Sequence, residues 1–211
     1  MCARVLATGQ LARLLERGIE PMATLYHWDL PVLELEFAIY IGVIFSLIFY
    51  LQATSKPRTV TIAPDHTDVK RSFVNIERVA VPTCPQLKVC RIDGPLYFGA
   101  VNKVADDLTE MLQGDEKNLL IVGNGISLID LAGAELLETQ VKLWKSKGGR
   151  LYFCSLRLQV REFLDKGGYK ELIGEDAIFE TKEEAIKQIY SGLDKDICST
   201  CEQRIFLECK Q

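Results

Sequence analysis

The sequence predicts an α/β domain with a mixed, partly parallel sheet and packed helices, preceded by one transmembrane helix. From Leu87 onward, strand-like and helix-like segments alternate over roughly a hundred residues, the order that builds a parallel sheet covered by helices. Ahead of them, residues 37–51 (FAIYIGVIFSLIFYL) form an apolar run without a charged residue. A chain of 211 residues has room for one such domain with appendages.

The apolar run predicts a transmembrane helix over 32–53. Residues 37–54 make eighteen uncharged residues, slightly fewer than the ~20 that a lone spanning helix needs. A helix buried in a soluble core is the alternative. Such a helix normally shows a polar stripe, whereas Ser46 is the only polar candidate inside the run. The membrane interpretation is therefore favoured.

The charges that flank the run predict its orientation. Glu34 and Glu36 precede it, and Lys56 and Arg58 follow it. Basic residues accumulate on the cytoplasmic side of membrane helices, so we expect a protein of the cell inner membrane whose carboxyl-terminal portion lies in the cytoplasm. The seven cysteines agree, because an odd number at irregular spacing makes a poor disulfide framework. The net charge of −4 gives no electrostatic reason to propose nucleic acid as a partner.

Residues 54–85 are expected to link the helix to the domain. This segment contains four of the seven prolines. Within it, residues 59–64 and 73–81 have the pattern of short extended segments between turns.

The domain itself is predicted to span 86–193. It begins with a strand, LKVCRID, in which apolar and polar residues alternate. Gly94 and Pro95 then turn the chain, and LYFGA (96–100) is expected to form a second strand. Apolar residues at helical spacing, among them Val104 and Met111, predict the first helix.

The rest of the domain continues the alternation. Residues 119–122 form a short apolar run, suited to a strand buried on both faces, and Gly-Asn-Gly at 123–125 ends it. A helix follows, with Leu131 and Trp144 on its apolar side. The remaining predicted elements are a strand at 150–154, a helix bearing Leu158, Phe163 and Leu164, and a final helix after a capping box of Thr181 and Glu184. We expect these apolar stripes to pack in the core.

At this point the sequence resembles a known family. The stretch LLIVGNGISLIDLAGAELL (119–137) resembles the central strand, loop and helix of STAS domains, named for sulfate transporters and anti-sigma-factor antagonists. RIDGPLYFGAVNKV resembles the SulP branch, and FAIYIGVIFSLIFYLQATSKPR resembles the last membrane helix and exit of SulP transporters. The resemblance implies a STAS-type domain that follows the last membrane helix of a SulP-type anion (sulfate) transporter, of which this chain is a carboxyl-terminal fragment.

The loop after the buried strand is the candidate site for a nucleotide or a partner. Its glycines could place N–H groups near a helix amino terminus, which is a generic anion-binding arrangement. A simple tight turn is the alternative, and the usual role of glycine favours it. Ser127 matches a helix-start cap, an interpretation that we prefer to a phosphorylation site. The candidate residues are Gly123, Asn124, Gly125, Ser127 and Asp130.

One residue of the following helix bears on regulation. In anti-sigma-factor antagonists, a serine just before the glycine at the start of this helix is phosphorylated to switch partner binding. The matching residue here is Ala132, followed by Gly133. Since alanine has no hydroxyl group, the resemblance implies that this switch is absent.

Three cysteines lie in the predicted tail, 194–211. Cys198 and Cys201 have CxxC spacing and Cys209 follows, a set suited to zinc or to a redox disulfide. A structural zinc site needs a fourth ligand, and the tail has no histidine. Cys154 would qualify only if the fold brought it close. Unliganded thiols, a zinc site and a redox pair all stay open, and no other cofactor is expected.

Residues 14–31 (LLERGIEPMATLYHWDLP) resemble a different family, the family 1 glycoside hydrolases of β-glucosidase type, with His27 and Trp28 matching residues near the sugar site. Glycoside hydrolysis needs paired carboxylates, which that family supplies in Asn-Glu-Pro and Glu-Asn-Gly motifs that this chain lacks. A (β/α)₈ barrel also takes about 250 residues. We therefore expect no enzyme activity. We expect a poorly ordered leader at 1–31, joined near Val32 by gene fusion, truncation or an assembly error.

Together these predictions indicate a cytoplasmic STAS regulatory or assembly domain of a SulP-type secondary anion transporter, for sulfate or bicarbonate. It is not expected to transport alone, because one helix cannot form a substrate site between repeats. The alternative is a membrane-tethered STAS interaction protein of the anti-sigma-factor-antagonist type. Expected partners are the membrane, the remaining transporter helices or a second copy of the chain, and a regulatory protein.

Overall fold

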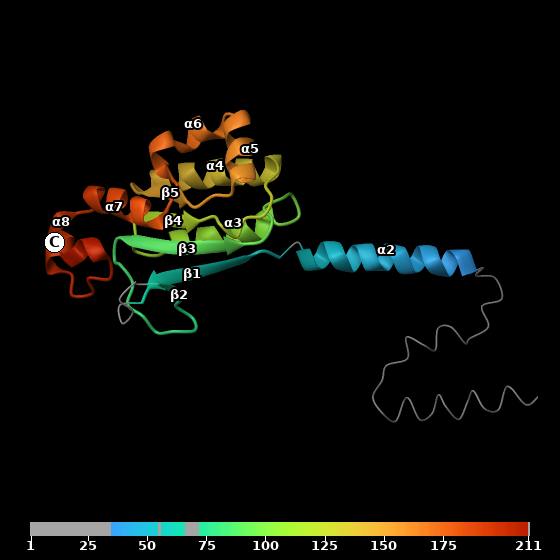
Figure 1. The fold of residues 1–211 in the computed structure, drawn as a ribbon, viewed down its shortest axis with the longest axis horizontal. Coiled ribbons are helices and arrows are strands. Elements are labelled where there is room, and N and C mark those ends of the chain that lie inside the picture. The colour runs from blue at the N-terminus through green and yellow to red at the C-terminus, as the bar shows by residue number, and fades with distance from the viewer. Residues whose placement is uncertain (1–34, 55, 66–71, 211) are drawn as a thin grey trace, which may run out of the picture. The chain divides into compact units, whose positions relative to one another are not determined.

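The computed structural model of the chain describes residues 35–54, 56–65 and 72–210 (Figure 1). It divides between Phe49 and Tyr50 into two compact units, and each is described by itself. The predicted leader at 1–31, with His27 and Trp28, lies outside the described residues. The glycosidase resemblance and the expected disorder of the leader therefore stay predictions.

Helix α2 (Leu35–Thr54) coincides with the apolar run. Its large apolar side chains between Phe37 and Leu51 are all exposed, at 42–65% of their full accessible area. Among the described residues, no helix combines the length and the apolar character that a membrane crossing requires. The transmembrane helix predicted over 32–53 is thus not confirmed and stays a prediction.

The second unit is built on a six-stranded sheet in the order β2-β1-β3-β4-β5-β6. β3 to β6 run parallel to one another, whereas β1 pairs antiparallel with both β3 and β2. The predicted mixed, partly parallel sheet is confirmed. The strands are β1 (Arg58–Pro64), β2 (Phe73–Asn75), β3 (Leu87–Asp93), β4 (Asn118–Val122), β5 (Arg150–Cys154) and β6 (Ile178–Phe179).

Helices connect the parallel strands, as the alternation in the sequence predicts. α3 (Val101–Leu112) joins β3 to β4, and α4 (Leu131–Ser146) joins β4 to β5. Between β5 and β6 lie α5 (Leu158–Lys166), α6 (Tyr169–Ile173) and the 3₁₀ turn η2 (Glu175–Ala177); after β6 come α7 (Lys182–Gly192), α8 (Lys195–Thr200) and the 3₁₀ turn η3 (Leu207–Lys210). The short elements α6, β6 and α8 were not predicted, because each is too short to show a period.

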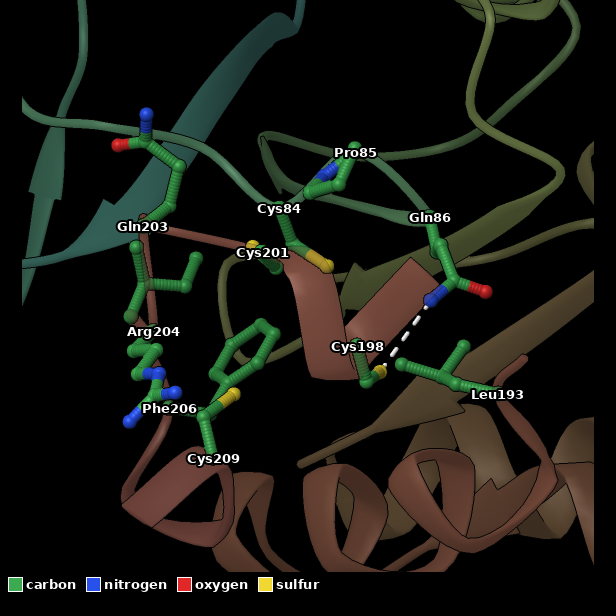
Figure 2. Close-up of a pocket in the computed structure, with 11 residues that line it drawn as sticks. Cys84, Pro85, Gln86, Leu193, Cys198, Cys201, Gln203, Arg204, Phe206 and Cys209 are labelled. Atoms are coloured by element: carbon green, nitrogen blue, oxygen red, sulfur yellow. Dashed lines mark hydrogen bonds between the residues drawn. The ribbon is translucent and has the colours of Figure 1, made fainter. Parts of the chain in front are cut away.

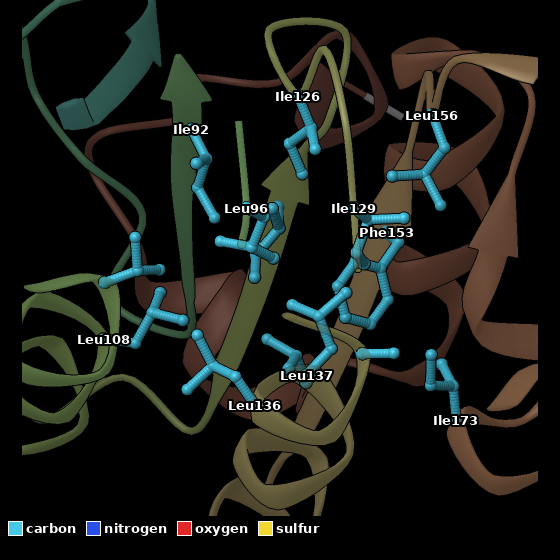
Figure 3. Close-up of a cluster of buried hydrophobic side chains, with 14 of the residues drawn as sticks. Ile92, Leu96, Leu108, Ile126, Ile129, Leu136, Leu137, Phe153, Leu156 and Ile173 are labelled. Carbon is cyan, nitrogen blue, oxygen red and sulfur yellow. The ribbon is translucent and has the colours of Figure 1, made fainter. Parts of the chain in front are cut away.

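Both faces of the sheet are buried in core clusters. Successive residues of a strand point to opposite sides, so one strand contributes to both clusters. In β4, Leu119 and Ile121 join a core cluster with residues of α3 and α4 (Figure 3). Leu120 and Val122 join a second cluster, with Ile186 of α7. The prediction that 119–122 is a strand buried on both faces is confirmed.

The segment predicted as a linker, 54–85, contributes β1 and β2 to this sheet. Four residue pairs join β1 to β3, from Arg58 opposite Asp93 to Thr61 opposite Cys90. The folded unit therefore begins well before residue 86, the predicted start of the domain. Because β1 is antiparallel to β3, the amino end of β1 lies at the edge of the sheet where the parallel strands end.

One predicted strand is wrong. Of residues 96–100 (LYFGA), only Leu96 pairs, through a single bridge to Ile129. The N–H of Ala100 donates to the carbonyl of Tyr97 at 2.7 Å, which turns the chain into α3. Leu96 is fully buried whereas Phe98 is exposed, so this apolar segment is a loop anchored by Leu96.

The predicted capping box at the start of α7 is confirmed with one difference. Thr181 Oγ1 accepts a hydrogen bond from the N–H of Glu184 at 3.2 Å. The carboxylate of Glu184 accepts from the N–H of Glu180, also at 3.2 Å, one residue before the Thr181 N–H that a capping box uses. Donors at the amino terminus of α7 are satisfied in either geometry.

Candidate functional site

The candidate loop runs from the end of β4 to the start of α4, at the carboxyl edge of the parallel strands. Its backbone groups are largely used within the fold. The N–H of Gly123 donates to the carbonyl of Cys154 at 2.9 Å, and the carbonyl of Gly125 accepts from the N–H of Gly94 at 3.0 Å. The carbonyl of Asn124 accepts from Nε of Arg157 at 2.9 Å. The loop is thus tied to the segments after both β3 and β5.

Asp130, and not Ser127, caps α4. Asp130 Oδ1 accepts from the N–H of Gly133 at 2.9 Å, and Oδ2 accepts from the N–H of Phe98 at 3.0 Å. The prediction of a cap at Ser127 is therefore wrong, and Ser127 itself is exposed. The helix begins three residues later than that prediction assumed, because residues 126–130 first run beside Leu96.

We expect Asp130→Ala to lower the free energy of unfolding by about 1–2 kcal/mol, because an orphaned helix N–H and the N–H of Phe98 both lose their acceptor. Asp130→Asn keeps one acceptor, for the helix N–H, but loses the acceptor for the Phe98 N–H, so it should cost less than Asp130→Ala, about 0.5–1 kcal/mol. Urea denaturation of the purified chain measures both. Ser127→Ala is the matched control and should fall within about 0.5 kcal/mol of the wild type. A larger loss from Ser127→Ala than from Asp130→Ala would contradict the assignment of the cap.

The position of Asp130 also bears on the predicted nucleotide site. Its carboxylate already lies at the amino terminus of α4, where an anion would bind. Gly125 leaves no room for a side chain, because an added Cβ would lie 2.9 Å from the Cα of Asp93. These contacts fit the tight-turn interpretation of the glycines. Nucleotide binding at Gly123, Asn124, Gly125, Ser127 and Asp130 stays a prediction.

Four large apolar side chains surround this loop and are exposed. Phe98 follows β3, Leu128 and Leu131 follow β4, and Leu158 follows β5; their exposed fractions are 78%, 57%, 60% and 69%. We call these four residues the carboxyl-edge patch. The sequence analysis assigned Leu131 and Leu158 to the core, which is wrong, since each is the first residue of its helix and lies beyond the sheet edge. Apolar residues at the carboxyl ends of three adjacent strands were the signal that could have identified the patch.

Ala132, the position of the implied absent phosphorylation switch, is half-buried in the first turn of α4. Next to it, Gly133 packs against the backbone of Leu96, and an added Cβ would meet the Leu96 carbonyl carbon at 3.1 Å. Position 132 therefore offers no hydroxyl group for phosphorylation.

The cysteine tail packs back on the domain. Cys198, Cys201 and Cys209 line a small cavity together with Cys84, which lies just before β3 (Figure 2). Cys84 was not predicted as part of this group, and Cys154, which was considered, is fully buried in β5 and does not line the cavity. Within the described residues, no three histidine, cysteine, aspartate or glutamate side chains already stand in an arrangement that holds a metal ion. The tail, predicted as a separate segment, also buries Ile205 and Phe206 in the second core cluster.

Comparison with known proteins identifies the family. The STAS domain model matches residues 78–185, about half of the chain. The fold is similar to that of the murine Solute Carrier 26 family member A9 anion transporter in its inward-facing state, with a TM-score of 0.69 and 19% identity over 75% of this chain and 26% of that one. At this identity the likeness concerns the fold alone.

Two curated relatives are similar in sequence. A putative sulfate transporter, YvdB of Bacillus subtilis (strain 168), is 28% identical over 100 residues, which are 47% of this chain and 19% of the relative. The probable sulfate transporter 4.2 of Arabidopsis thaliana is 24% identical over 166 residues, covering 72% of this chain and 24% of the relative. The chain thus spans about a fifth to a quarter of the length of these relatives. STAS domains are regulatory or interaction domains, and this chain belongs to the STAS domain family.

Proposed function

We propose that this chain supplies the cytoplasmic regulatory and assembly domain of a SulP-type secondary anion transporter, for sulfate or bicarbonate. The observation that carries the proposal is the extent of the similarity to the Arabidopsis thaliana transporter. It covers 72% of the chain, which is more than the STAS segment 78–185 spans. The relationship therefore includes residues outside the STAS segment, as expected for a piece of a transporter.

In this proposal, transport itself depends on membrane segments other than those described. Secondary transporters bind their substrate near the middle of the bilayer, between repeated groups of helices. A single helix followed by a STAS domain offers no such site. The STAS domain instead acts on assembly, delivery to the membrane or regulation.

We assign α2 to the membrane domain of this transporter. Its large side chains between Phe37 and Leu51 are apolar on every side of the helix and exposed. Exposure of so much apolar surface to water is unfavourable in free energy. These fifteen residues span about 22 Å as a helix, less than the ~30 Å of a hydrocarbon core. A short helix can be accommodated by a locally thinner bilayer or by association with other helices. The basic residues Lys56 and Arg58 that follow α2 support a cytoplasmic position of the STAS domain in this proposal.

The topology of the sheet shows at which edge the chain enters the STAS domain. The chain enters the sheet from α2 at Arg58, opposite Asp93 at the carboxyl end of β3. Pro57 packs against the backbone of Gly94, where an added Cβ would lie 3.0 Å from the Pro57 Cβ. The carboxyl-edge patch therefore lies at the edge of the sheet through which the chain arrives from α2. In this proposal the patch contacts the cytoplasmic side of the transporter's membrane domain.

Cloning the complete reading frame that encodes this chain tests the proposal. We expect the frame to continue upstream of the codon for Val32 with several apolar spans, and cells that express it to take up labelled sulfate or bicarbonate. The 211-residue chain alone should remain in the membrane pellet after an alkaline carbonate wash and should not raise uptake. A stop codon or a promoter immediately upstream of that codon, or a freely water-soluble chain, would contradict the proposal.

A further inference from the structure

The cavity between the tail and the segment before β3 contains an unusual concentration of thiols. Cys84 lines it from the segment before β3 (Figure 2). Cys198 belongs to α8, Cys201 is the residue that follows α8, and Cys209 belongs to η3. All four are free thiols. We propose that these four cysteines bind one thiophilic metal ion, Zn(II), which fastens the tail to the segment before β3. This inference is independent of the proposed transport function.

The ligand number and type fit zinc. Structural zinc sites in proteins commonly use four cysteine sulfurs, two of them from a CxxC pair. Cys198 and Cys201 form that pair, Cys209 lies eight residues further on, and Cys84 supplies the fourth sulfur, which the tail lacks. The fold therefore completes a ligand set that is incomplete in the tail alone.

A hydrogen-bond donor already points at one of the sulfurs. Nε2 of Gln86 donates to Sγ of Cys198 at 3.2 Å. Such a donor stabilises negative charge on sulfur, and metal-bound thiolates use donors in the same way. A neutral thiol gains much less from it.

Gln86 also holds the two halves of the site together. Its side chain donates to the carbonyl of Asp194 at 3.0 Å and accepts from the Asp194 N–H at 2.9 Å. Asp194 in turn caps α8, which carries Cys198. Ile205 and Phe206, both nearly fully buried, anchor the chain between Cys201 and Cys209. The backbone of the site is thus fixed by contacts other than the thiols.

Charge balance at the site would be set by the metal ion and by a nearby arginine. Zn(II) replaces the thiol protons, which are released to the solvent. Arg204, which lines the cavity, offsets part of the negative charge of a tetrathiolate site.

The sulfurs must turn to bind the ion, since no three ligands among the described residues yet surround a common point. Cys198, Cys201 and Cys209 are only half-buried. A cysteine side chain moves between staggered positions by rotation about a single bond, which is the movement that the proposal requires of these thiols.

The test measures metal in the full chain, purified in mild detergent under reducing conditions, exposed to Zn(II) and then dialysed. We expect about one zinc per chain by mass spectrometry, as for a single four-thiolate site. Cys84→Ala and Cys201→Ala should each lower the content at least about tenfold, because a ligand is lost. Cys90→Ala is the matched control: it removes a buried thiol of β3 that lies outside the cavity and should leave the zinc content unchanged.

Cobalt substitution keeps the test decisive if a variant fails to fold. Co(II) bound to the wild-type chain should show the charge-transfer absorption of four thiolates and the visible bands of a tetrahedral ion. Absence of metal in the wild type, absorption from only two thiolates, or full zinc content in a folded Cys84→Ala variant would overturn the proposal. A Cys198–Cys201 disulfide that forms without metal would overturn it as well.

Discussion

Gly149→Ala is expected to prevent the chain from forming a stable STAS domain. Gly149 lies between α4 and β5, where β5 begins to pair with β4, and the N–H of Arg150 donates to the carbonyl of Lys117 at 3.2 Å. A Cβ on Gly149 would overlap that carbonyl oxygen and would lie 3.1 Å from the Cα of Lys117. Both obstructing atoms are backbone atoms of the neighbouring strand, so no side chain can turn away to make room.

We expect this substitution to cost more than about 4 kcal/mol, a range reached only when packing or backbone geometry fails. Two other glycines separate the effect of steric overlap by an added Cβ from the effect of an unfavourable backbone φ. Gly148 has a positive φ of 78° and nothing within 4 Å of an added Cβ, so Gly148→Ala should cost about 1–2 kcal/mol. Gly192 has open space and no positive φ, so Gly192→Ala should be nearly neutral.

Thermal unfolding followed by circular dichroism ranks the three variants. If the free energy of unfolding of Gly149→Ala lies within about 1 kcal/mol of that of Gly148→Ala, the pairing of β4 with β5 differs from the one described. Absence of a cooperative transition in Gly149→Ala alone, with both controls cooperative, is the expected outcome.

Under the proposed function, Phe98→Asp combined with Leu131→Asp is expected to uncouple the STAS domain from the rest of the transporter. Both side chains belong to the carboxyl-edge patch and are mostly exposed in this chain. If they are buried against the membrane domain, each replacement removes an apolar anchor and places a charge in an apolar interface. Large apolar anchors at interface centres commonly contribute about 2 kcal/mol or more each, so we expect uptake by the complete transporter to fall at least tenfold.

The effect should arise at the interface and not in the fold. Because both residues are exposed, the double variant of the 211-residue chain should unfold within about 1 kcal/mol of the wild type. Leu172→Asp is the matched control, since Leu172 is 56% exposed on α6 and lies outside the patch. Uptake by the complete transporter that carries Leu172→Asp should remain within about twofold of wild-type uptake.

Two results would contradict the assignment of the patch. One is unchanged uptake in the double variant. The other is a chain that dimerises by itself through Phe98 and Leu131 while uptake is unaffected, which would make the patch an interface between copies. Analytical ultracentrifugation in detergent distinguishes the second result from loss of contact with the membrane domain.

Much of the fold could be predicted from local sequence patterns. The alternation of apolar and polar residues in LKVCRID predicted β3. The continuous apolar run at 119–122 predicted β4, and apolar residues at helical spacing before Gly148 predicted α4. These elements were predictable because the period of a strand or a helix depends on adjacent residues only. The same reasoning failed at LYFGA, where a short apolar segment is a loop anchored by Leu96. A run of that length has the same pattern in either structure.

The candidate sites were predicted less completely, because they depend on contacts between distant residues. The loop at 123–130 was located, but its cap was assigned to Ser127, since the sequence does not show where α4 begins. Leu131 and Leu158 fit the apolar faces of their helices, and only the extent of the sheet leaves them exposed. The pairing of Cys84 with a tail more than a hundred residues away follows from no local pattern.

The sequence by itself determined the alternation of the longer strands and helices from β3 onward, the apolar character of α2 and the absence of a hydroxyl group at Ala132. Tertiary structure alone decided that β1 joins the sheet beside β3, that the apolar patch and the entry of the chain from α2 share one edge, and that four thiols meet in one cavity. The physical reason is the range of the interactions. Periodicity and propensity act between neighbours in sequence, whereas strand pairing and burial act between segments that only the folded chain brings together.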